Sequence, residues 1–143
     1  MIGDLHLRSS HSTGRLTVTE LMLAAAERGL SHVAVADLNT TEATAQAMKA
    51  AARLRMTAIP AVEITAHLEG AETPISILAY GFADAAAAVE RVCMAARSAG
   101  DDLRRPATTA ADGNGSQRPV KTSPPGGGFP SASDVIAAIH SDG

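Results

Sequence analysis

Residues Asp4–Gly14 read DLHLRSSHSTG and decide how the rest of the chain is interpreted. An aspartate and a histidine within one short strand, followed by a run of Ser, His, Thr and Gly, are too polar for a simple core strand. We therefore predict a strand at Ile2–Leu7 whose C-terminal tip carries a functional site, followed by a polar loop.

Strand and helix patterns alternate after this tip. Thr17 and Glu20 have the spacing of a capping box, which predicts a helix that ends at Gly29. The elements predicted next are a strand at His32–Asn39, a helix N-capped by Thr40 with Glu42 in its first turn and Lys49, Arg53 and Arg55 near its end, a strand at Thr57–Thr65, a strand at 74–82 and a helix at 84–100. The first three strands are too far apart for hairpins, which favours an α/β fold with parallel strands joined by right-handed crossovers.

Ionisable side chains lie where these strands end. Asp4 and His6 end the first strand, Asp37 ends the second and Glu63 lies late in the third. Because parallel α/β folds gather their chemistry at the C-terminal ends of the strands, we expect these four groups to converge on one rim.

The chain divides into three segments by composition. Residues 1–99 form the predicted β/α core, residues 100–130 a flexible Gly/Pro-rich loop or linker, and residues 131–143 a C-terminal helix capped by Ser131 or Ser133.

Composition limits the function classes. The formal net charge of −3 over 143 residues argues against a broad nucleic-acid surface or binding to an anionic membrane, while a small phosphorylated ligand at a local site is compatible with it. The single cysteine, Cys93, suits a reducing compartment, and the apolar runs are shorter than a membrane span. We expect a soluble cytoplasmic protein.

Four motifs in this chain carry a resemblance to a known family. The opening motif is similar to D-L-H-x-H-S-x-x-S-D-G-x-x-T-P-E-E-L, which is typical of the PHP (polymerase and histidinol phosphatase) family. The later segments VAVADLNTT, IPAVEIT and ISILAYGF resemble V-A-L-T-D-H-x-T-T, I-P-G-V-E-I-S and I-H-I-L-G-Y-G-F of the same family. The matches occur in family order and cover roughly residues 2–82, with the small stand-alone PHP phosphoesterases as the nearest likeness.

The resemblance implies a fold and a chemistry. The fold is a distorted (β/α)7 barrel, of which this chain would form the N-terminal part. The implied cofactors are divalent metals, Mn, Zn or Fe, that bind phosphate oxygens and generate hydroxide for phosphoester hydrolysis of nucleotide-like substrates.

The family's metal ligands carry over only in part. His6 matches a ligand histidine and Glu63 the bridging glutamate, while Asp4 and Asp37 match supporting positions. Four other ligand positions are replaced, by Arg8, Thr13, Leu38 and Ser76. Because Arg8 would repel a cation, we expect an incomplete metal cluster and weak or absent hydrolysis. His11 and His67 are substitute ligands to consider.

Three alternatives remain open from the sequence. The chain hydrolyses phosphoesters weakly through His6 and Glu63, or it binds a phosphorylated ligand without hydrolysis through Arg8, or it is a structural remnant that needs another segment or partner chain. In the last case an open sheet edge would favour self-association. A salt bridge between Arg8 and Glu63 would hold the rim together without metal.

Overall fold

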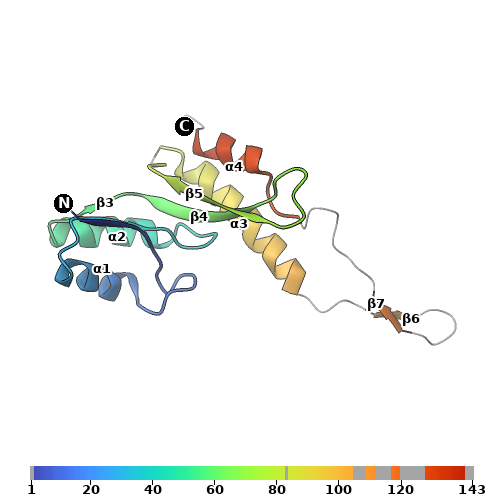
Figure 1. Cartoon of the computed structure of the whole chain (residues 1–143), viewed down its shortest axis with the longest axis horizontal. Helices are drawn as coiled ribbons and strands as arrows, with labels where there is room; N and C mark the ends of the chain where they lie inside the picture. Colours follow the sequence, from blue (N-terminus) through green and yellow to red (C-terminus); the bar gives the residue numbers. More distant parts are fainter. Residues whose placement is uncertain (1, 83, 105–108, 112–116, 120–127, 141–143) are drawn as a thin grey trace.

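The computed structural model describes residues 2–82, 84–104, 109–111, 117–119 and 128–140. Its N-terminal half is a parallel sheet with strand order β1-β2-β3, covered by two helices that pack against each other (Figure 1). These elements are β1 (Gly3–Leu7), α1 (Val18–Glu27), β2 (His32–Val35), α2 (Ala43–Arg53) and β3 (Thr57–Ala58). The predicted order of strands and helices and the parallel pairing of the first strands are confirmed.

Helix α1 begins as its sequence predicts. The side chain of Thr17 accepts a hydrogen bond from the backbone N–H of Glu20, and the Glu20 carboxylate accepts one from the backbone N–H of Thr17. Gly29 follows the helix with a φ of 74°, a conformation that glycine adopts without steric cost. Met22 and Val18 then face the sheet and are buried.

Helix α2 begins later than predicted. Thr40 is not its N-cap: the Thr40 hydroxyl accepts from the N–H of Glu42, and Glu42 itself occupies the cap position without a side-chain cap. Instead, residues on either side of Thr40 contact distant parts of the chain. The Asn39 amide donates to the Thr65 hydroxyl, and the Thr41 hydroxyl donates to the Glu90 carboxylate. Arg55 lies outside the helix with a φ of 56°, so Arg53 is the basic residue of the last turn.

The predicted third strand is divided in two at Pro60. Proline has no N–H to donate to a ladder, and the chain changes partners there. Before it, β3 pairs with β2; after it, β4 (Ala61–Ala66) runs beside the segment that follows β2. Glu63 N–H donates to the carbonyl of Asp37 at 3.0 Å, and Asn39 N–H donates to the carbonyl of Glu63 at 2.6 Å.

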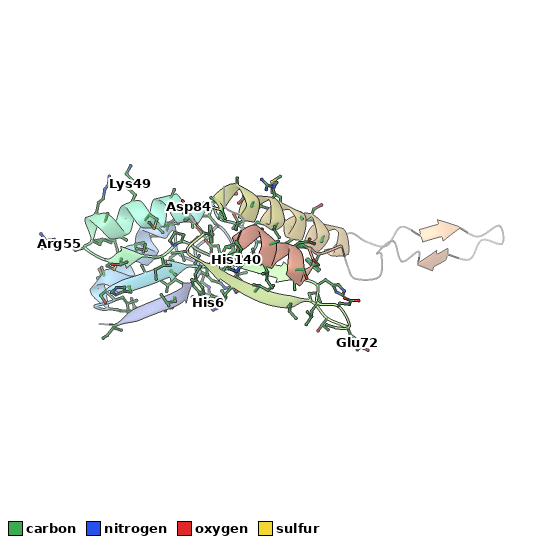
Figure 2. All side chains as sticks on the ribbon, turned by 90° about the horizontal axis from the view of Figure 1, so that it is seen from above. His6, Lys49, Arg55, Glu72, Asp84 and His140 are labelled. Atoms are coloured by element: carbon green, nitrogen blue, oxygen red, sulfur yellow. The ribbon has the colours of Figure 1, made fainter. Side chains whose placement is uncertain are left out.

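The fourth predicted strand is present, but its pairing departs from the parallel β/α pattern. Strand β5 (Ile75–Tyr80) pairs antiparallel with β4, with Glu63 opposite Leu78. The connection between them contains Gly70 at a φ of 81° and is short enough for a hairpin. Figure 2 places Glu72, in this connection, far from His6.

One face of the β4–β5 hairpin forms a second core. Helices α3 (Ala86–Arg104) and α4 (Ala132–Ile139) pack against it. The largest buried side chains of this core are Val62, Ile64, Phe82, Val89, Cys93 and Val135. Burial raises the pKa of the Cys93 thiol to about 12, so this cysteine is a protonated core residue at neutral pH.

The structure describes only parts of the C-terminal segments drawn from composition. Helix α3 continues to Arg104, and a short antiparallel pair, β6 (Thr109–Ala111) with β7 (Gln117–Pro119), lies within the predicted loop. The remaining loop positions, 105–108, 112–116 and 120–127, fall outside the described residues, as do 141–143. The final helix is confirmed, with Ser131 rather than Ser133 as its N-cap. Among the described helices, none is long and apolar enough to cross a membrane.

Candidate functional site

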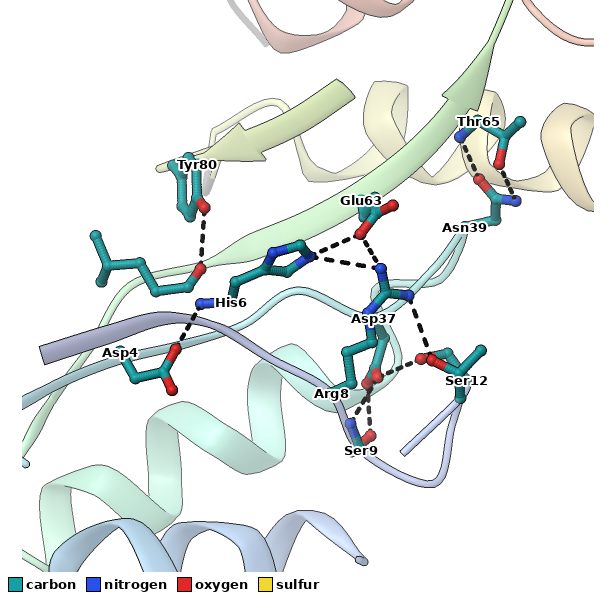
Figure 3. A network of polar contacts seen from close by, with 12 residues as sticks. Asp4, His6, Arg8, Ser9, Ser12, Asp37, Asn39, Glu63, Thr65 and Tyr80 are labelled. Carbon is teal, nitrogen blue, oxygen red and sulfur yellow. Dashed lines mark hydrogen bonds and ion pairs between the residues drawn. The ribbon is translucent and has the colours of Figure 1, made fainter. Parts of the chain in front are cut away.

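The carboxylate of Glu63 is the centre of the candidate site. Its Oε2 atom lies 2.7 Å from Nε2 of His6 and also accepts a hydrogen bond from Nη2 of Arg8 (Figure 3). The Glu63 side chain is 8% exposed, while those of Arg8 and His6 are 26% and 46% exposed. A buried anion therefore meets two partly exposed side chains from the first strand, and the salt bridge expected between Arg8 and Glu63 is confirmed.

Strand periodicity explains why these groups meet. His6 lies near the end of β1 and Arg8 is the first residue after that strand; Nη2 of Arg8 lies 3.5 Å from Nε2 of His6, so both side chains reach the Glu63 carboxylate from the same side. In β4, Glu63 alternates with Val62 and Ile64, whose side chains are fully buried in the core formed with α3 and α4. The core-facing valine and isoleucine thus direct the glutamate to the opposite face, toward β1.

The site holds Glu63 in its ionised form. Burial alone raises the pKa of this carboxyl group, but hydrogen bonds from His6 and Ser76 and the positive charge of Arg8 outweigh it. The pKa of Glu63 therefore lies below its ordinary value. Ser76, which stands where the resembling family has a histidine, contributes a hydroxyl group instead.

The predicted residue Asp4 does not join this cluster. Its Oδ1 atom accepts a hydrogen bond from the backbone N–H of His6 at 3.0 Å, and the residue is exposed. Asp4 therefore contacts the backbone of the strand that carries His6 and lies away from the Glu63 carboxylate (Figure 3).

Asp37 organises the loop after β1. It is fully buried and accepts three hydrogen bonds: from the Ser9 N–H at 2.7 Å, the Ser9 hydroxyl at 2.5 Å and the Ser12 hydroxyl at 2.6 Å. Gly14 closes the same loop, where a Cβ atom would lie 2.1 Å from the carbonyl oxygen of Arg8. The roles of Ser9 and Ser12 were not predicted, although the serine-rich loop and an aspartate at the end of an apolar strand were both visible in the sequence.

Asn39 is a second residue that sequence reasoning missed. It has a φ of 55°, in the left-handed region, and its side-chain amide accepts from the Thr65 N–H at 2.7 Å and donates to the Thr65 hydroxyl at 3.1 Å. Its carbonyl accepts from Nη1 of Arg97 at 2.7 Å. Asn39 therefore joins the end of β2 to β4 and to α3, next to the candidate site.

The donor set does not fit a divalent cation. A metal ion bound to Glu63 would meet the Arg8 guanidinium, which already pairs with the same carboxylate oxygen. The Glu63 carboxylate thus already serves as the counter-ion of Arg8. The two substitute histidines lie elsewhere: His11 pairs with Glu42 at 3.1 Å, and the backbone of His67 pairs with Pro130 and Ala132. Among the described residues, no group of three or more His, Cys, Asp or Glu is placed to hold a metal ion.

Comparison with known proteins gives one curated relative and several solved structures. The chain is 29% identical over 93 residues to the phosphoribosyl 1,2-cyclic phosphate 1,2-diphosphodiesterase of Eggerthella lenta, covering 65% of this chain and 36% of that protein. A crystal structure of a protein assigned as a metal-dependent phosphoesterase from Bifidobacterium adolescentis matches with a TM-score of 0.61 and 26% identity, over 73% of this chain and 35% of that one.

A second solved structure shows the same fold. An amidohydrolase from Chromobacterium violaceum, with bound sulfate and no metal, matches with a TM-score of 0.59 and 27% identity over 78% of this chain and 41% of that one. This chain therefore spans about a third of the length of the curated relative, at 36%, and well under half of both structures. The expected α/β fold class is confirmed.

The family model described as PHP domain matches residues 4–105, which include all of β1 but its first residue, the Glu63 cluster and the whole of α3. The same span holds the four motifs that resemble this family and the fold that the solved structures share. This chain belongs to the PHP domain family.

Proposed function

We propose that this chain is a PHP domain of the metal-dependent phosphoesterase lineage that has given up metal-dependent hydrolysis, because a resident arginine takes the place of the metal. The observation that carries the proposal is the Arg8 guanidinium on Oε2 of Glu63, the carboxylate at the family's bridging position. The lineage itself is supported by the phosphoesterase and diphosphodiesterase relatives.

Electrostatics favour the arginine over a metal at this rim. A divalent cation 4 Å from a guanidinium is repelled by about 8 kcal/mol at an effective dielectric constant near 20. One histidine and one shared carboxylate offer too few donors to offset that repulsion. A bound metal is the group that would lower the pKa of a water molecule toward neutrality, so we expect this rim not to hydrolyse phosphoesters by the metal-dependent route.

The first test measures metal content and turnover together. We expect purified protein incubated with Mn²⁺, Zn²⁺ or Fe²⁺ to retain substoichiometric metal after gel filtration and to leave bis(p-nitrophenyl) phosphate unhydrolysed above the buffer rate. The H6A variant is the matched control, since it removes the candidate histidine ligand and should behave like the wild type in both assays. Stoichiometric metal with turnover that H6A abolishes would contradict the proposal.

A second candidate is that the same rim binds a phosphorylated small molecule without hydrolysing it. Arg8 is 26% exposed, and its contacts to Glu63 and Thr13 leave further N–H groups able to donate. A related structure holds sulfate without metal, which supports anion binding on this scaffold. Arginine is well suited to such a ligand because its planar fork matches phosphate oxygens.

Titration with ribose 5-phosphate and with inorganic phosphate tests this second candidate. We expect R8A to lose binding and E63Q to strengthen it by about tenfold, or about 1.4 kcal/mol, because the neutral amide no longer competes for the guanidinium. Isothermal titration calorimetry measures the binding affinity of the wild type and of each variant. Binding that is unchanged in R8A would reject Arg8 as the anion ligand.

Two further expectations belong to the proposal. Strand β1 is an edge of its sheet and is largely exposed, which supports self-association through that edge. The single buried cysteine supports a cytoplasmic location.

A further inference from the structure

Strand β5 has an edge that faces no other strand of the described residues, since β5 is hydrogen-bonded to β4 alone. On its other side, β4 is bonded to the segment after β2. The Glu63 N–H donates to the Asp37 carbonyl there, and the Glu63 carbonyl accepts from the Asn39 N–H. Because Glu63 turns both backbone groups away from β5, the residue opposite it, Leu78, points its own N–H and C=O toward the free edge.

Two more residues of β5 share this orientation. Backbone groups alternate in direction along a strand, so Ser76 and Tyr80 point outward together with Leu78. The bonding beyond the strand agrees, because the Gly81 N–H, one residue past Tyr80, donates back to the Pro60 carbonyl at 2.8 Å. Among the described residues, no hydrogen bond outside the hairpin uses the backbone of these three. The edge therefore presents a row of unpaired donors and acceptors.

The sequence of β5 lacks the features by which edge strands avoid pairing. Ile75–Tyr80 reads ISILAY, without a charged residue, a proline or a glycine. Leu78 and Tyr80 are each 38% exposed on the face that also carries Glu63. On the opposite face, Ile77 is only partly buried against the core formed with α3 and α4. Apolar surface on both faces of this strand therefore remains available to a neighbouring strand.

Strand β1, the open edge of the other sheet, is less suited to strand addition. It carries Asp4 and His6, and its register with β2 shifts between Asp4 and Leu7. The carbonyl of Leu5 already accepts a hydrogen bond from the Tyr80 hydroxyl at 2.9 Å (Figure 3). Charged side chains and irregular register oppose pairing at an edge. Of the two open edges, β5 is thus the better surface for another strand.

We propose that the β5 edge pairs antiparallel with the β5 edge of a second copy of this chain, with Leu78 of one copy opposite Leu78 of the other. The edge is complementary to itself in this register. The outward N–H of each Leu78 meets the outward C=O of the other, and Ser76 of each copy exchanges the same bonds with Tyr80 of its partner. A slip of one residue would turn the backbone groups of one copy away, so it is excluded.

The pairing would place a residue of the second copy beside the candidate site. Leu78 shares a face with Glu63, and the Ser76 hydroxyl is hydrogen-bonded to the Glu63 carboxylate. In the proposed register, Tyr80 of the second copy stands next to Ser76 on that face. This inference goes beyond the proposed function and does not depend on it, because backbone pairing of β5 requires neither a metal nor a phosphorylated ligand.

Sedimentation velocity of the full chain over a range of concentrations tests the pairing. We expect the wild type to dimerise and Leu78→Lys to raise the Kd of the dimer about tenfold or more, because like charges would stand directly opposite each other. Leu23→Lys is the matched control, since it adds the same charge to a leucine of α1 that is 46% exposed. Leu5→Lys makes the same change in β1. Both should dimerise as the wild type does.

Leu78→Pro gives a second way to block the edge. It removes an N–H that points outward and takes no bond from the β4 ladder, so the variant should remain folded, by thermal unfolding, and be monomeric.

Cysteine cross-linking tests the register. Residues at such a pair have Cα atoms about 5.5 Å apart, within the range that a disulfide spans. Cys93 is buried and does not compete. We expect oxidised Leu78→Cys to form a disulfide-linked dimer at concentrations where Leu23→Cys remains monomeric.

The contrary outcomes are distinct. A wild type that stays monomeric at its highest soluble concentration would overturn the inference. So would dimerisation that Leu5→Lys abolishes and Leu78→Lys leaves unchanged, since that result places the interface at β1. Cross-linking of Leu78→Cys no greater than that of Leu23→Cys would also reject it, and this readout holds even if the lysine and proline variants are insoluble. None of these results changes the metal content or turnover by which the proposed function is tested.

Discussion

Replacement of Asp37 by alanine is expected to lower the free energy of unfolding by about 4 kcal/mol, because it removes a buried anion that accepts three hydrogen bonds. The hydroxyls of Ser9 and Ser12 can rotate toward other partners, but the backbone N–H of Ser9 is fixed and would be left buried without an acceptor. The loop that carries Arg8 into the site would lose its anchor at the same time.

Urea unfolding followed by circular dichroism measures this loss. S12A is the matched control: it removes one partly buried hydroxyl donor and should cost about 1 kcal/mol, since the carboxylate keeps both bonds from Ser9. The stability of D37N should lie between those of D37A and S12A. Its amide oxygen can still accept a hydrogen bond, but its amide nitrogen is a donor and would face other hydrogen-bond donors. Equal stabilities of D37A and S12A would refute the anchoring role.

Replacement of Asn39 by alanine is the second large effect, with an expected loss of about 3 kcal/mol. Two causes add. The side-chain amide makes a double hydrogen bond with Thr65, and alanine leaves the Thr65 N–H without its acceptor. Alanine also tolerates the left-handed backbone less well than asparagine, and the φ here is 55°.

The N39G variant separates these causes. Glycine adopts the left-handed conformation without steric cost but lacks the amide, so N39G should be more stable than N39A by about 1 kcal/mol and less stable than the wild type. The free energies of unfolding of N39G and N39A are measured by urea unfolding of proteins prepared in parallel. If N39G proves less stable than N39A, the backbone conformation is not a source of strain at this position.

Local signals in the sequence were sufficient for the start of α1 and left two candidate caps, Ser131 and Ser133, for α4. In the structure Thr17 with Glu20, and Ser131 with Asp134, each form the reciprocal capping box. These interactions join residues three apart, so their information is contained in a few neighbouring letters. The start of α2 shows the limit of this approach: Thr40 has the chemistry of a cap, but its neighbours Asn39 and Thr41 are engaged by Thr65 and Glu90 from distant parts of the chain.

The pairing of strands depended on contacts that no local pattern contains. Both β4 and β5 were recognisable as strands, yet the pattern of residues did not show that they pair antiparallel or that the chain changes partners at Pro60. An alternation of apolar residues records which face of a strand is buried, but it does not record the direction of the neighbouring strand.

For the site, the sequence by itself determined the membership of the PHP family and the candidates His6, Arg8 and Glu63, because these rest on residue types at set spacings. Only the tertiary structure decided that the Arg8 guanidinium lies on the Glu63 carboxylate and that Asp37 is fully buried among serine donors. The physical reason is that a charged side chain interacts with the groups that the fold brings within a few ångströms, wherever they lie in the sequence. Here Arg8 is 55 positions from Glu63, and Ser9 is 28 positions from Asp37.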